Sequence, residues 1–419
     1  MPLLDRHLAG EVNDLMGTFR LVILGGARQT GKTTMAREQL GLAPTARLSF
    51  DDQLTLSQAV EDPVGFVDSL PSPTVVDEFQ RAGPGFLLAV KQRVDRDNTR
   101  GQFLLTGSAN YTAGRGIAET LAGRAGRAVL WPLSMGERQG VRESFLDRLF
   151  EPADWPPRAS PIARADLVEA ILMGGFPEVV TQGLTARRRH GWFSGYVADV
   201  VSREALRPMA DIRMESELRT LLRLLAARTS NELVISDLSN DAQLSRPTVA
   251  NYVSLLEALY LVVQIPPWSR NITSQAKRRT KVIIADTGLA GDLCSVRTSD
   301  FAATADGRIG GALFETFVAT ELLKQAGWSE RTIDLFHYRD RAGPEVDVVL
   351  EDRHTGQVAA VEVKLTATPM SRQARHLALL RDRLGDSFTI GALVHAGTQT
   401  VPMGRRLWAI PVSALWRTD

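Results

Sequence analysis

The chain has 419 residues, of which 44% are hydrophobic and 23% are charged. This composition is ordinary for a soluble globular protein and excludes disordered and collagen-like classes; the length allows two to three domains at roughly 150 residues each. Basic and acidic residues number 49 and 48, so the net charge of +1 gives no global indication of nucleic acid binding. The single cysteine, Cys294, excludes a disulfide framework and any metal site built from several cysteines.

The first 150 residues alternate short apolar segments with helical stretches. Buried parallel strands are apolar throughout, and the intervening helices act as crossovers, so this pattern predicts an α/β domain with a parallel sheet. The expected strands are 21–24, 46–50, 74–76 and 102–105. No run approaches the roughly 18 apolar residues of a membrane-spanning helix, and 21–26 is too short for a signal peptide. We therefore expect a cytoplasmic protein with no membrane partner.

A phosphate-binding loop follows the first expected strand. The sequence Gly26-Ala-Arg-Gln-Thr-Gly31-Lys32-Thr33 matches the P-loop pattern, and a helix is expected over 34–40. Glycines let backbone N–H groups wrap the phosphates, Lys32 reaches the β and γ oxygens, and the Thr33 hydroxyl lies on Mg²⁺. The prediction is an ATP site with Mg²⁺, formed by Gly26, Ala27, Arg28, Gln29, Thr30, Gly31, Lys32, Thr33 and Thr34.

Two more expected strands end in groups suited to phosphate chemistry. The strand 74–76 is followed by Asp77 and Glu78, which indicates a Walker B site where Asp77 holds Mg²⁺ and Glu78 polarises the attacking water. The strand 102–105 is followed by Thr106 and Ser108, either of which could contact the γ-phosphate or orient water.

Arginines follow on a glycine-rich stretch, 114–126, that we expect to be helical. Arg115, Arg124 or Arg127 could serve as an arginine finger, in the same chain or from a neighbouring subunit of a homo-oligomer. The alternative is that they are ordinary surface arginines. We assign the finger to Arg124.

Beyond residue 150 the composition changes in steps. A linker with four prolines is expected over 151–162, after an ATPase domain over 1–150. A helical middle region is expected over 163–230, a winged helix-turn-helix over 231–285, and an α/β domain over 286–419.

The helix-turn-helix prediction rests on apolar residues at helical spacing between Ile235 and Leu259. Ser236 and Ser245 are placed as N-caps, and Pro247 lies in the first turn of the second helix. DNA or RNA contacts are expected from the second helix through Arg246, Thr248 and Asn251, and from a basic wing through Arg270, Lys277, Arg278 and Arg279. The alternative is a packing module between two enzymatic lobes, and the sequence does not distinguish DNA from RNA.

Near the C-terminus two strands, 346–350 and 358–364, form a hairpin. A turn centred between His354 and Thr355 places Asp347 directly opposite Glu362, with Lys364 on the same face. Two facing carboxylates repel, so such a pair usually persists where a metal ion or a lysine neutralises it.

Asp followed by Glu-x-Lys on adjacent strands resembles the nuclease constellation of the PD-(D/E)xK type. The resemblance implies Mg²⁺ on Asp347 and Glu362, a further acid from Glu315 on the helix 311–324, and a Lys364 that stabilises charge or activates water. Only six of the 49 basic residues are lysines, so a lysine at position 364 slightly favours the nuclease interpretation. Glu345 is a nearby acid expected on the opposite strand face. The alternative is an inactive site, or one that binds nucleic acid without cutting it.

Several motifs together resemble the prokaryotic AAA-type ATPases that carry a long C-terminal domain. They are the 26–33 loop, Asp77-Glu78-Phe-Gln80, and the segments 105–108, 121–124, 174–178, 285–289, 345–347 and 361–364. The resemblance implies ATP binding, ATP hydrolysis and a DNA- or RNA-related role.

Three functions follow as hypotheses. The first is a P-loop ATPase coupled to a nucleic-acid-binding, nuclease-like C-terminal half. The second is a nucleotidyl transferase that places AMP on RNA or protein, as a growth-arresting toxin would. The third is a nucleotide switch that binds ATP without turnover and rearranges the winged helix for a protein partner.

Overall fold

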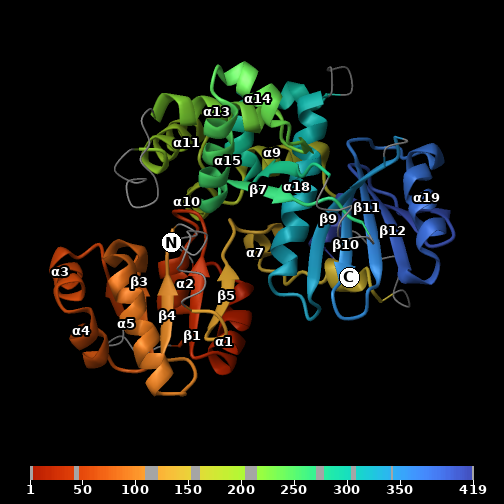
Figure 1. Cartoon of the computed structure of the whole chain (residues 1–419). Coiled ribbons are helices and arrows are strands. Elements are labelled where there is room, and N and C mark those ends of the chain that lie inside the picture. Colours follow the sequence, from red (N-terminus) through yellow and green to blue (C-terminus); the bar gives the residue numbers. More distant parts are fainter. Residues whose placement is uncertain are drawn as a thin grey trace.

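The structure is a computed structural model that describes residues 3–41, 47–108, 121–151, 161–202, 215–269, 278–302, 308–340 and 343–417. The N-terminal sheet and the C-terminal sheet lie at opposite sides of the molecule, and the helices of the middle region lie between and above them in the view of Figure 1. No helix in these ranges is long and apolar enough to cross a membrane.

The N-terminal unit is an α/β layer around a five-stranded sheet of order β2-β3-β4-β1-β5, in which every pairing is parallel. This confirms the predicted parallel sheet. Its strands are β1 (Leu21–Gly25), β2 (Arg47–Ser49), β3 (Thr74–Asp77), β4 (Phe103–Thr106) and β5 (Ala125–Val129). Its helices are α1 (Leu8–Thr18), α2 (Lys32–Glu38), α3 (Gln53–Glu61), α4 (Pro63–Ser69) and α5 (Gly83–Arg96).

The fifth strand, β5, is the element that the sequence pattern did not predict. We expected the whole stretch 114–126 to be helical, which is wrong for its described part, since 121–124 form a turn and 125 and 126 lie in β5. Residues 109–120, including Arg115, are outside the described residues. The sequence Ala-Gly-Arg-Ala-Val of β5 has no continuous apolar run and therefore lacks the usual pattern of a buried strand.

A helical region follows, and its first two helices precede residue 150, within the stretch that the sequence analysis gave to the ATPase domain. Its helices are α7 (Met135–Gln139), α8 (Phe145–Arg148), α9 (Arg164–Met173), α10 (Pro177–Gln182), α11 (Ala186–Val200) and α13 (Glu215–Ala227). Most of the expected linker, 152–160, lies outside the described residues.

Two helices joined by a short turn come next. The helices are α14 (Ile235–Ala242) and α15 (Arg246–Ala258), packed beside an antiparallel sheet of order β6-β8-β7. The strands are β6 (Asn231–Glu232), β7 (Val262–Ile265) and β8 (Lys281–Ile284). The hydroxyl of Ser245 accepts the N–H of Thr248, which confirms that N-cap. The Ser236 cap is wrong, because α14 begins before it and is capped by no side chain.

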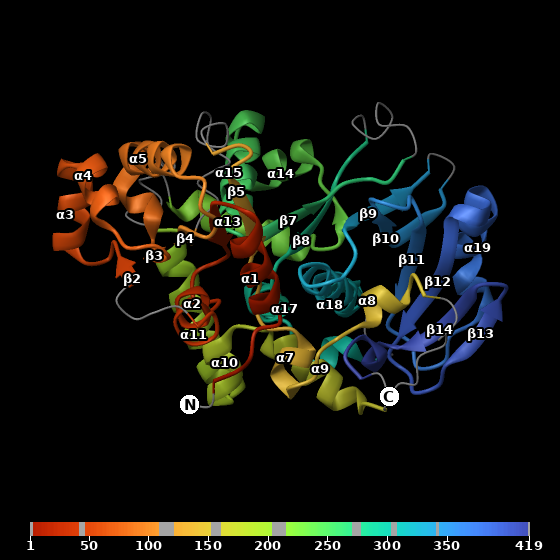
Figure 2. The same cartoon turned by 90° about the horizontal axis from the view of Figure 1, so that it is seen from below.

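The C-terminal part is a six-stranded mixed sheet of order β13-β14-β12-β11-β10-β9. Its strands are β9 (Ile333–Arg339), β10 (Glu345–Asp352), β11 (Val358–Lys364), β12 (Phe388–His395), β13 (Val401–Gly404) and β14 (Leu407–Pro411). The helices here are α17 (Thr287–Leu293), α18 (Arg308–Ala326) and α19 (Arg375–Leu384). Figure 2 shows α18 and α19 on opposite sides of this sheet.

The hydrophobic core shows how these parts are held together. The two faces of the N-terminal sheet carry separate clusters of buried side chains. A third cluster is a single connected group of buried side chains drawn from between Met135 and Trp416, and it includes side chains of α13, α15, α18 and β11. The helical region, the helix-turn-helix and one face of the C-terminal sheet therefore pack on one core. The other face of the C-terminal sheet packs with α19 on a separate cluster, and the N-terminal sheet has its own clusters.

Candidate functional site

The loop 26–31 joins β1 to α2 with the backbone conformation that its glycines allow. Gly26 and Gly31 have φ values of 147° and 93°, which side-chain-bearing residues rarely adopt. A Cβ on Gly26 would lie 2.4 Å from the carbonyl oxygen of Leu130, so no larger residue fits there. Lys32 is buried and its ammonium donates to the carbonyl oxygens of Gly26 (2.9 Å) and Ala27 (2.8 Å).

The ends of β3 and β4 meet this loop at the carboxyl edge of the sheet. Thr33 donates its hydroxyl proton to Oδ2 of Asp77 at 2.6 Å, and Thr106 donates to Oδ1 of the same carboxylate. Because β4 lies between β1 and β3, Thr106 comes from the strand next to both the loop strand and the Asp77 strand. Three residues that the sequence analysis selected separately are thereby joined through one carboxylate.

Glu78 lies next to Asp77 in the chain, and its carboxylate is held by two hydrogen bonds. Its Oε2 accepts a hydrogen bond from the Ser108 hydroxyl at 3.0 Å and another from the side-chain amide of Gln80. Glu78 has a left-handed backbone conformation, with φ at 53°, which turns the chain sharply after β3. Ser108 thus contacts Glu78, whereas Thr106 contacts Asp77.

Lys32, Thr33 and Glu78 line one cavity of about 600 Å³, together with Arg28, Gln29, Gly31, Thr34 and Asp51. The opposite wall consists of residues from α10 and α11 that the sequence analysis missed. They are Pro177, Glu178, Gln182, Tyr196, Asp199 and Val200. A cavity of this size, between a phosphate-binding loop and a helical wall, has room for a nucleotide.

Burial is the main influence on the pKa of Lys32. Desolvation lowers the pKa of Lys32 to about 8, although the neighbouring Glu78 and Asp77 favour its charged form. The ammonium that would meet the phosphates is therefore less basic than an exposed lysine.

Arg6 supports the loop from the N-terminal segment and was also missed. Its guanidinium donates to the carbonyl oxygens of Thr30 (2.6 Å) and Trp131 (2.7 Å). It also forms a buried ion pair with Glu137 at 3.0 Å. The planar fork of arginine matches these three acceptors, so Arg6 fixes the loop against the segment that leaves β5.

The turn between α9 and α10 is fixed by a buried aspartate of the C-terminal half. Oδ2 of Asp286 accepts the N–H of Gly175 at 2.6 Å, and Oδ1 accepts the N–H of Leu289 at 2.9 Å. Burial raises the pKa of Asp286, while these two N–H groups favour its charged form. Through this turn Asp286 sets the start of α10, which carries Pro177 and Glu178 to the nucleotide cavity.

Arg124 does not reach this cavity in its own chain, which corrects the finger assignment within one chain. It precedes Ala125, the residue that pairs with Leu21 at the amino end of β1, whereas the loop follows the carboxyl end. Its guanidinium is held by Asp95, with a bond of 3.2 Å from Nη2 to Oδ2. Arg127 lies within β5, beside Ile23.

In the C-terminal sheet, the predicted hairpin register is confirmed. Val348 pairs with Val361 and Val349 with Ala360, so Asp347 and Glu362 are the next facing residues. Oδ2 of Asp347 accepts the N–H of Val363 at 2.8 Å. Lys364 lies 2.6 Å from Oε1 of Glu362 and 3.8 Å from Oδ2 of Asp347. The sequence prediction that these three side chains meet is supported by these contacts.

A lysine to which the sequence analysis gave no role, two residues after the last arginine of the expected basic wing, lies inside this cluster. Lys281, the first residue of β8, is 2% exposed, and its ammonium is 2.7 Å from Oε1 of Glu315 on α18. It also lies 3.7 Å from Oδ1 of Asp347 and 3.6 Å from Oε1 of Glu345. The expectation that Glu345 points away is wrong, since residues two apart in a strand share a face.

The pKa values of the cluster follow from burial and mutual charge. Burial and the charge of Asp347 raise the pKa of Glu315 and of Glu362, while Lys281 and Lys364 act in the opposite direction. Burial would lower the pKa of Lys281, but the surrounding carboxylates outweigh it and raise that pKa above its usual value. Asp347, Glu315 and Glu362 therefore share two lysine ammonium groups.

These residues do not fit a metal ion as they are arranged. Within the described ranges, no group of three or more carboxylate, histidine or cysteine side chains is placed to hold one. Lys281 occupies the position between Glu315 and Asp347, and Lys364 takes Oε1 of Glu362. Beside the cluster lies a cavity of about 620 Å³, lined by Glu315, Lys364, Arg308, Ser230 and Asn231 among others.

On the helix-turn-helix, Arg246 and Asn251 are exposed and Thr248 is half-buried at the start of α15. Arg278 donates to the carbonyl oxygen of Arg339 at 2.6 Å, and the carbonyl oxygen of Arg279 contacts His337. Arg270 and Lys277 lie outside the described residues. Arg278 is thus tied to β9 through its guanidinium, and Arg279 through its main chain.

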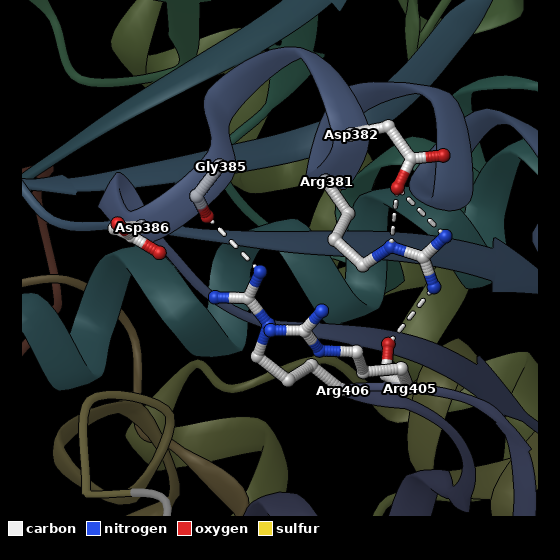
Figure 3. Close-up of a pocket in the computed structure, with 6 residues that line it drawn as sticks. All are labelled: Arg381, Asp382, Gly385, Asp386, Arg405 and Arg406. Atoms are coloured by element: carbon white, nitrogen blue, oxygen red, sulfur yellow. Dashed lines mark hydrogen bonds and ion pairs between the residues drawn. The ribbon is translucent and has the colours of Figure 1, made fainter.

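A smaller pocket of about 340 Å³ lies between the end of α19 and the β13–β14 turn. Figure 3 shows that its arginines are used internally: Arg381 donates to Asp382 and to the carbonyl oxygen of Arg405. Arg406 reaches the carbonyl oxygen of Gly385 at 3.0 Å. We assign no ligand to it.

The parallel sheet of order β2-β3-β4-β1-β5, with the loop after β1 and acids after β3, gives the N-terminal unit a P-loop ATPase-like α/β fold. Three families match successive parts of the chain. They are the AAA domain over residues 18–139, a domain of unknown function (DUF8612) over 164–300, and another (DUF4143) over 310–415.

Among relatives, two mycobacterial proteins, from Mycobacterium bovis and Mycobacterium tuberculosis, are both described as uncharacterized. Each is 26% identical over 419 residues, which covers 99% of this chain and 85% of the relative. Among solved structures, a Walker-type ATPase of Pyrococcus abyssi is 15% identical with a TM-score of 0.43, covering 70% of this chain and 96% of that one. The RuvB Holliday junction branch migration motor of Thermotoga maritima is 16% identical with a TM-score of 0.30, covering 63% and 90%. Both scores are below 0.5, so we draw nothing further from these two likenesses.

Proposed function

We propose that this chain is a Mg²⁺-dependent ATPase coupled to a nucleic-acid-binding, nuclease-like C-terminal half. The observation that carries the proposal is the junction of Thr33, Asp77 and Thr106, beside Lys32 and Glu78 in a cavity of nucleotide size. A hydroxyl and a carboxylate at the end of a phosphate-binding loop are the ligands that P-loop enzymes use.

The side chains have separable roles in this proposal. Lys32 leaves the carbonyl oxygens of Gly26 and Ala27 and pairs instead with phosphate oxygens. Thr33 and Asp77 would hold Mg²⁺, which would neutralise charge on the phosphates. Glu78 orients and polarises the attacking water, and Ser108 fixes the Glu78 carboxylate through the bond at 3.0 Å. A finger arginine would have to come from another copy of the chain or from another residue, since Arg124 lies at the far edge of the sheet.

The helix-turn-helix supplies the proposed contact with nucleic acid. Arg246 and Asn251 are exposed at the start of α15, the position from which a recognition helix reaches bases or phosphates. The chain just after this helix meets the strand that leads into the phosphate-binding loop: a Cβ on Gly25, the last residue of β1, would lie 2.0 Å from the hydroxyl of Tyr260, two residues after α15. This contact is the route by which we propose that nucleotide state and α15 are coupled.

The first test follows α-labelled ATP with Mg²⁺, with and without DNA or RNA. We expect ADP as the labelled product, loss of binding in Lys32→Ala, and binding without turnover in Glu78→Gln. Glu61→Gln, an exposed residue of α3, is the matched control and should behave as the unaltered protein. Label attached to RNA or protein would favour the nucleotidyl transferase, and indifference to Glu78→Gln would favour the non-hydrolysing switch.

The second test measures nucleic acid affinity against salt. Arg246→Ala should weaken binding and reduce the salt dependence, because a phosphate contact releases counterions. Arg223→Ala, exposed on α13, serves as the matched control. Equal affinities for the two variants would remove α15 from the interface and leave the packing module as the better interpretation.

A further inference from the structure

The position between Glu315 and Asp347 is filled by the ammonium group of Lys281. Glu315 comes from α18 and Asp347 from β10, whereas Lys281 comes from β8 of the three-stranded sheet beside the helix-turn-helix. The ammonium lies 2.7 Å from Glu315 and 3.7 Å from Asp347. Lys281 is among the largest fully buried side chains, so its charge is not a surface feature that happens to lie nearby.

The cluster also has the donor set that a hard divalent cation prefers. Asp347, Glu315 and Glu362 offer carboxylate oxygens, which suit Mg²⁺ and Mn²⁺. Glu362 is 5% exposed, and its Oε2 is buried with no hydrogen-bond partner, which is costly for a charged group. Two lysines, Lys281 and Lys364, balance the acids with the charge that one divalent cation would otherwise bring.

We propose that Lys281 takes the place of a divalent cation in the carboxylate cluster and keeps the cluster closed to metal while β8 is in its present position. The inference rests on the nuclease-like site of the proposed function and adds a specific regulation to it. Asp347 and Glu315 are held together by the ammonium group, and metal binds only after that group has left.

The origin of Lys281 explains what would open the site. Lys281 pairs with Ile265 on β7 and with Glu232 on β6, so it is fixed by the sheet that belongs to the helix-turn-helix. The residues just before it, Arg278 to Thr280, end the basic segment that the sequence analysis expects to contact nucleic acid. A displacement of β8 is therefore the movement that would withdraw the ammonium, and no residue of the C-terminal sheet need move first.

The experiment measures binding of Mn²⁺ by electron paramagnetic resonance on the full chain without nucleotide. All variants carry Asp77→Asn, which removes the metal ligand of the ATPase site. The parent protein, which keeps Lys281, is compared with the Lys281→Met variant. The Lys281→Met variant is then compared with the variant that carries both Lys281→Met and Asp347→Asn. We expect Mn²⁺ affinity to rise about tenfold or more in Lys281→Met and to fall back in the double variant.

Lys324→Met is the matched control. Lys324 is also buried, and its ammonium also lies 2.7 Å from a glutamate of α18, Glu321. The Lys324→Met substitution removes an equivalent buried charge away from the Asp347 cluster, so it should not increase Mn²⁺ binding. Because a buried glutamate left without its lysine can destabilise the fold, circular dichroism checks each variant, and Lys281→Gln provides a second substitution that keeps a polar side chain.

Three results would overturn the inference. The first is Asp347-dependent Mn²⁺ binding while Lys281 is still present. The second is a folded Lys281→Met or Lys281→Gln that binds no more Mn²⁺ than the parent, and the third is an equal gain in Lys324→Met. If neither Lys281 variant folds without metal, Mn²⁺ should restore the circular dichroism signal in an Asp347-dependent manner, and a failure to do so counts against the inference.

The same samples separate this inference from the proposed function. Cleavage of labelled DNA and RNA is measured alongside metal binding. Gain of Mn²⁺ binding without cleavage would uphold the role of Lys281 and remove nuclease activity from the proposal. Cleavage by the protein with Lys281 unchanged would support nuclease activity and contradict the role of Lys281.

Discussion

Thr33 and Asp77 are joined by a hydrogen bond of 2.6 Å that connects the phosphate-binding loop to the end of β3. The bond places a hydroxyl and a carboxylate side by side before any nucleotide is bound. Little rearrangement of these two groups is then needed when a metal–nucleotide complex enters the cavity.

Thr33→Val keeps the shape of the side chain and removes the hydroxyl. We expect the Mg²⁺ concentration needed for half-maximal ATP turnover to rise about 10- to 100-fold, because one ligand of the ion is lost. Thr220→Val, exposed on α13, should leave this value unchanged. A Thr33→Val protein with unaltered Mg²⁺ dependence would show that Thr33 serves only to hold Asp77.

Arg6→Ala tests the support of the loop. It leaves the carbonyl oxygens of Thr30 and Trp131 without their guanidinium donor and removes the ion-pair partner of the buried Glu137. We expect the free energy of unfolding to fall by about 3 kcal/mol and the affinity for ATP to weaken, as measured by urea denaturation and by nucleotide titration.

Arg124→Ala is the comparison for Arg6→Ala, since the Arg124–Asp95 pair is partly exposed at the far edge of the sheet. It should cost little stability, because solvent-accessible ion pairs are weak. It should also leave ATP turnover unchanged. A large loss of turnover in Arg124→Ala that depends on protein concentration would instead support a finger supplied by a neighbouring subunit.

The lowered pKa of Lys32 predicts how ATP affinity depends on pH. Below pH 8 the free protein already carries the ammonium form, so this group adds no pH dependence. As the pH rises through about 8 the free side chain loses its proton, and binding must take one up. The dissociation constant should then rise by up to about tenfold per pH unit.

Lys32→Arg provides the control for that titration, because a guanidinium stays charged throughout this range. Its ATP affinity should be lower overall but flat with pH, after correction for the ionisation of ATP itself. Proton uptake on binding is measured by calorimetry in buffers of different ionisation enthalpy. No proton uptake by the unaltered protein at about pH 8.5 would contradict the prediction.

Asp286→Ala removes the carboxylate that fixes the turn before α10. The N–H groups of Gly175 and Leu289 lose their acceptor in a fully buried place, so we expect a loss of about 3 kcal/mol in the free energy of unfolding. Asp292→Ala, whose partner His190 is largely exposed, should cost much less. Similar losses in both variants would mean that Asp286 does not determine this turn.

The parts of the site that follow from local rules could be predicted from the sequence. The P-loop and the acids after β3 come with short apolar strands, and the carboxyl ends of parallel strands share one edge of the sheet. The register of β10 on β11 followed from one turn and from the alternation of side chains, and the observed pairs agree with it.

The remaining parts depend on contacts between segments far apart in the chain. Nothing near Lys281 in the sequence indicates that β8 reaches α18 and β10, so the sequence analysis gave this residue no role. Arg124 was misplaced because β5 lacks an apolar run. A usable indication existed for Lys281: the chain has only six lysines, and Lys32, Lys281 and Lys324 are all buried. A compact ammonium fits such enclosed places better than the wide guanidinium fork.

Helix α18 carries polar side chains to two different places. Glu315, in its first half, meets Lys281, while Glu321 accepts the N–H of Met135 and Lys324 donates to the carbonyl oxygen of Leu133. Glu315 and Lys324 are about 13 Å apart along the axis, since each residue of a helix advances 1.5 Å. The segment 133–137 also carries Glu137, the partner of Arg6, which in turn holds the phosphate-binding loop. Arg6, the segment 133–137 and α18 therefore form a continuous chain of contacts between the phosphate-binding loop and the Lys281–Glu315 pair, which is the physical connection that coupling between the two sites would require.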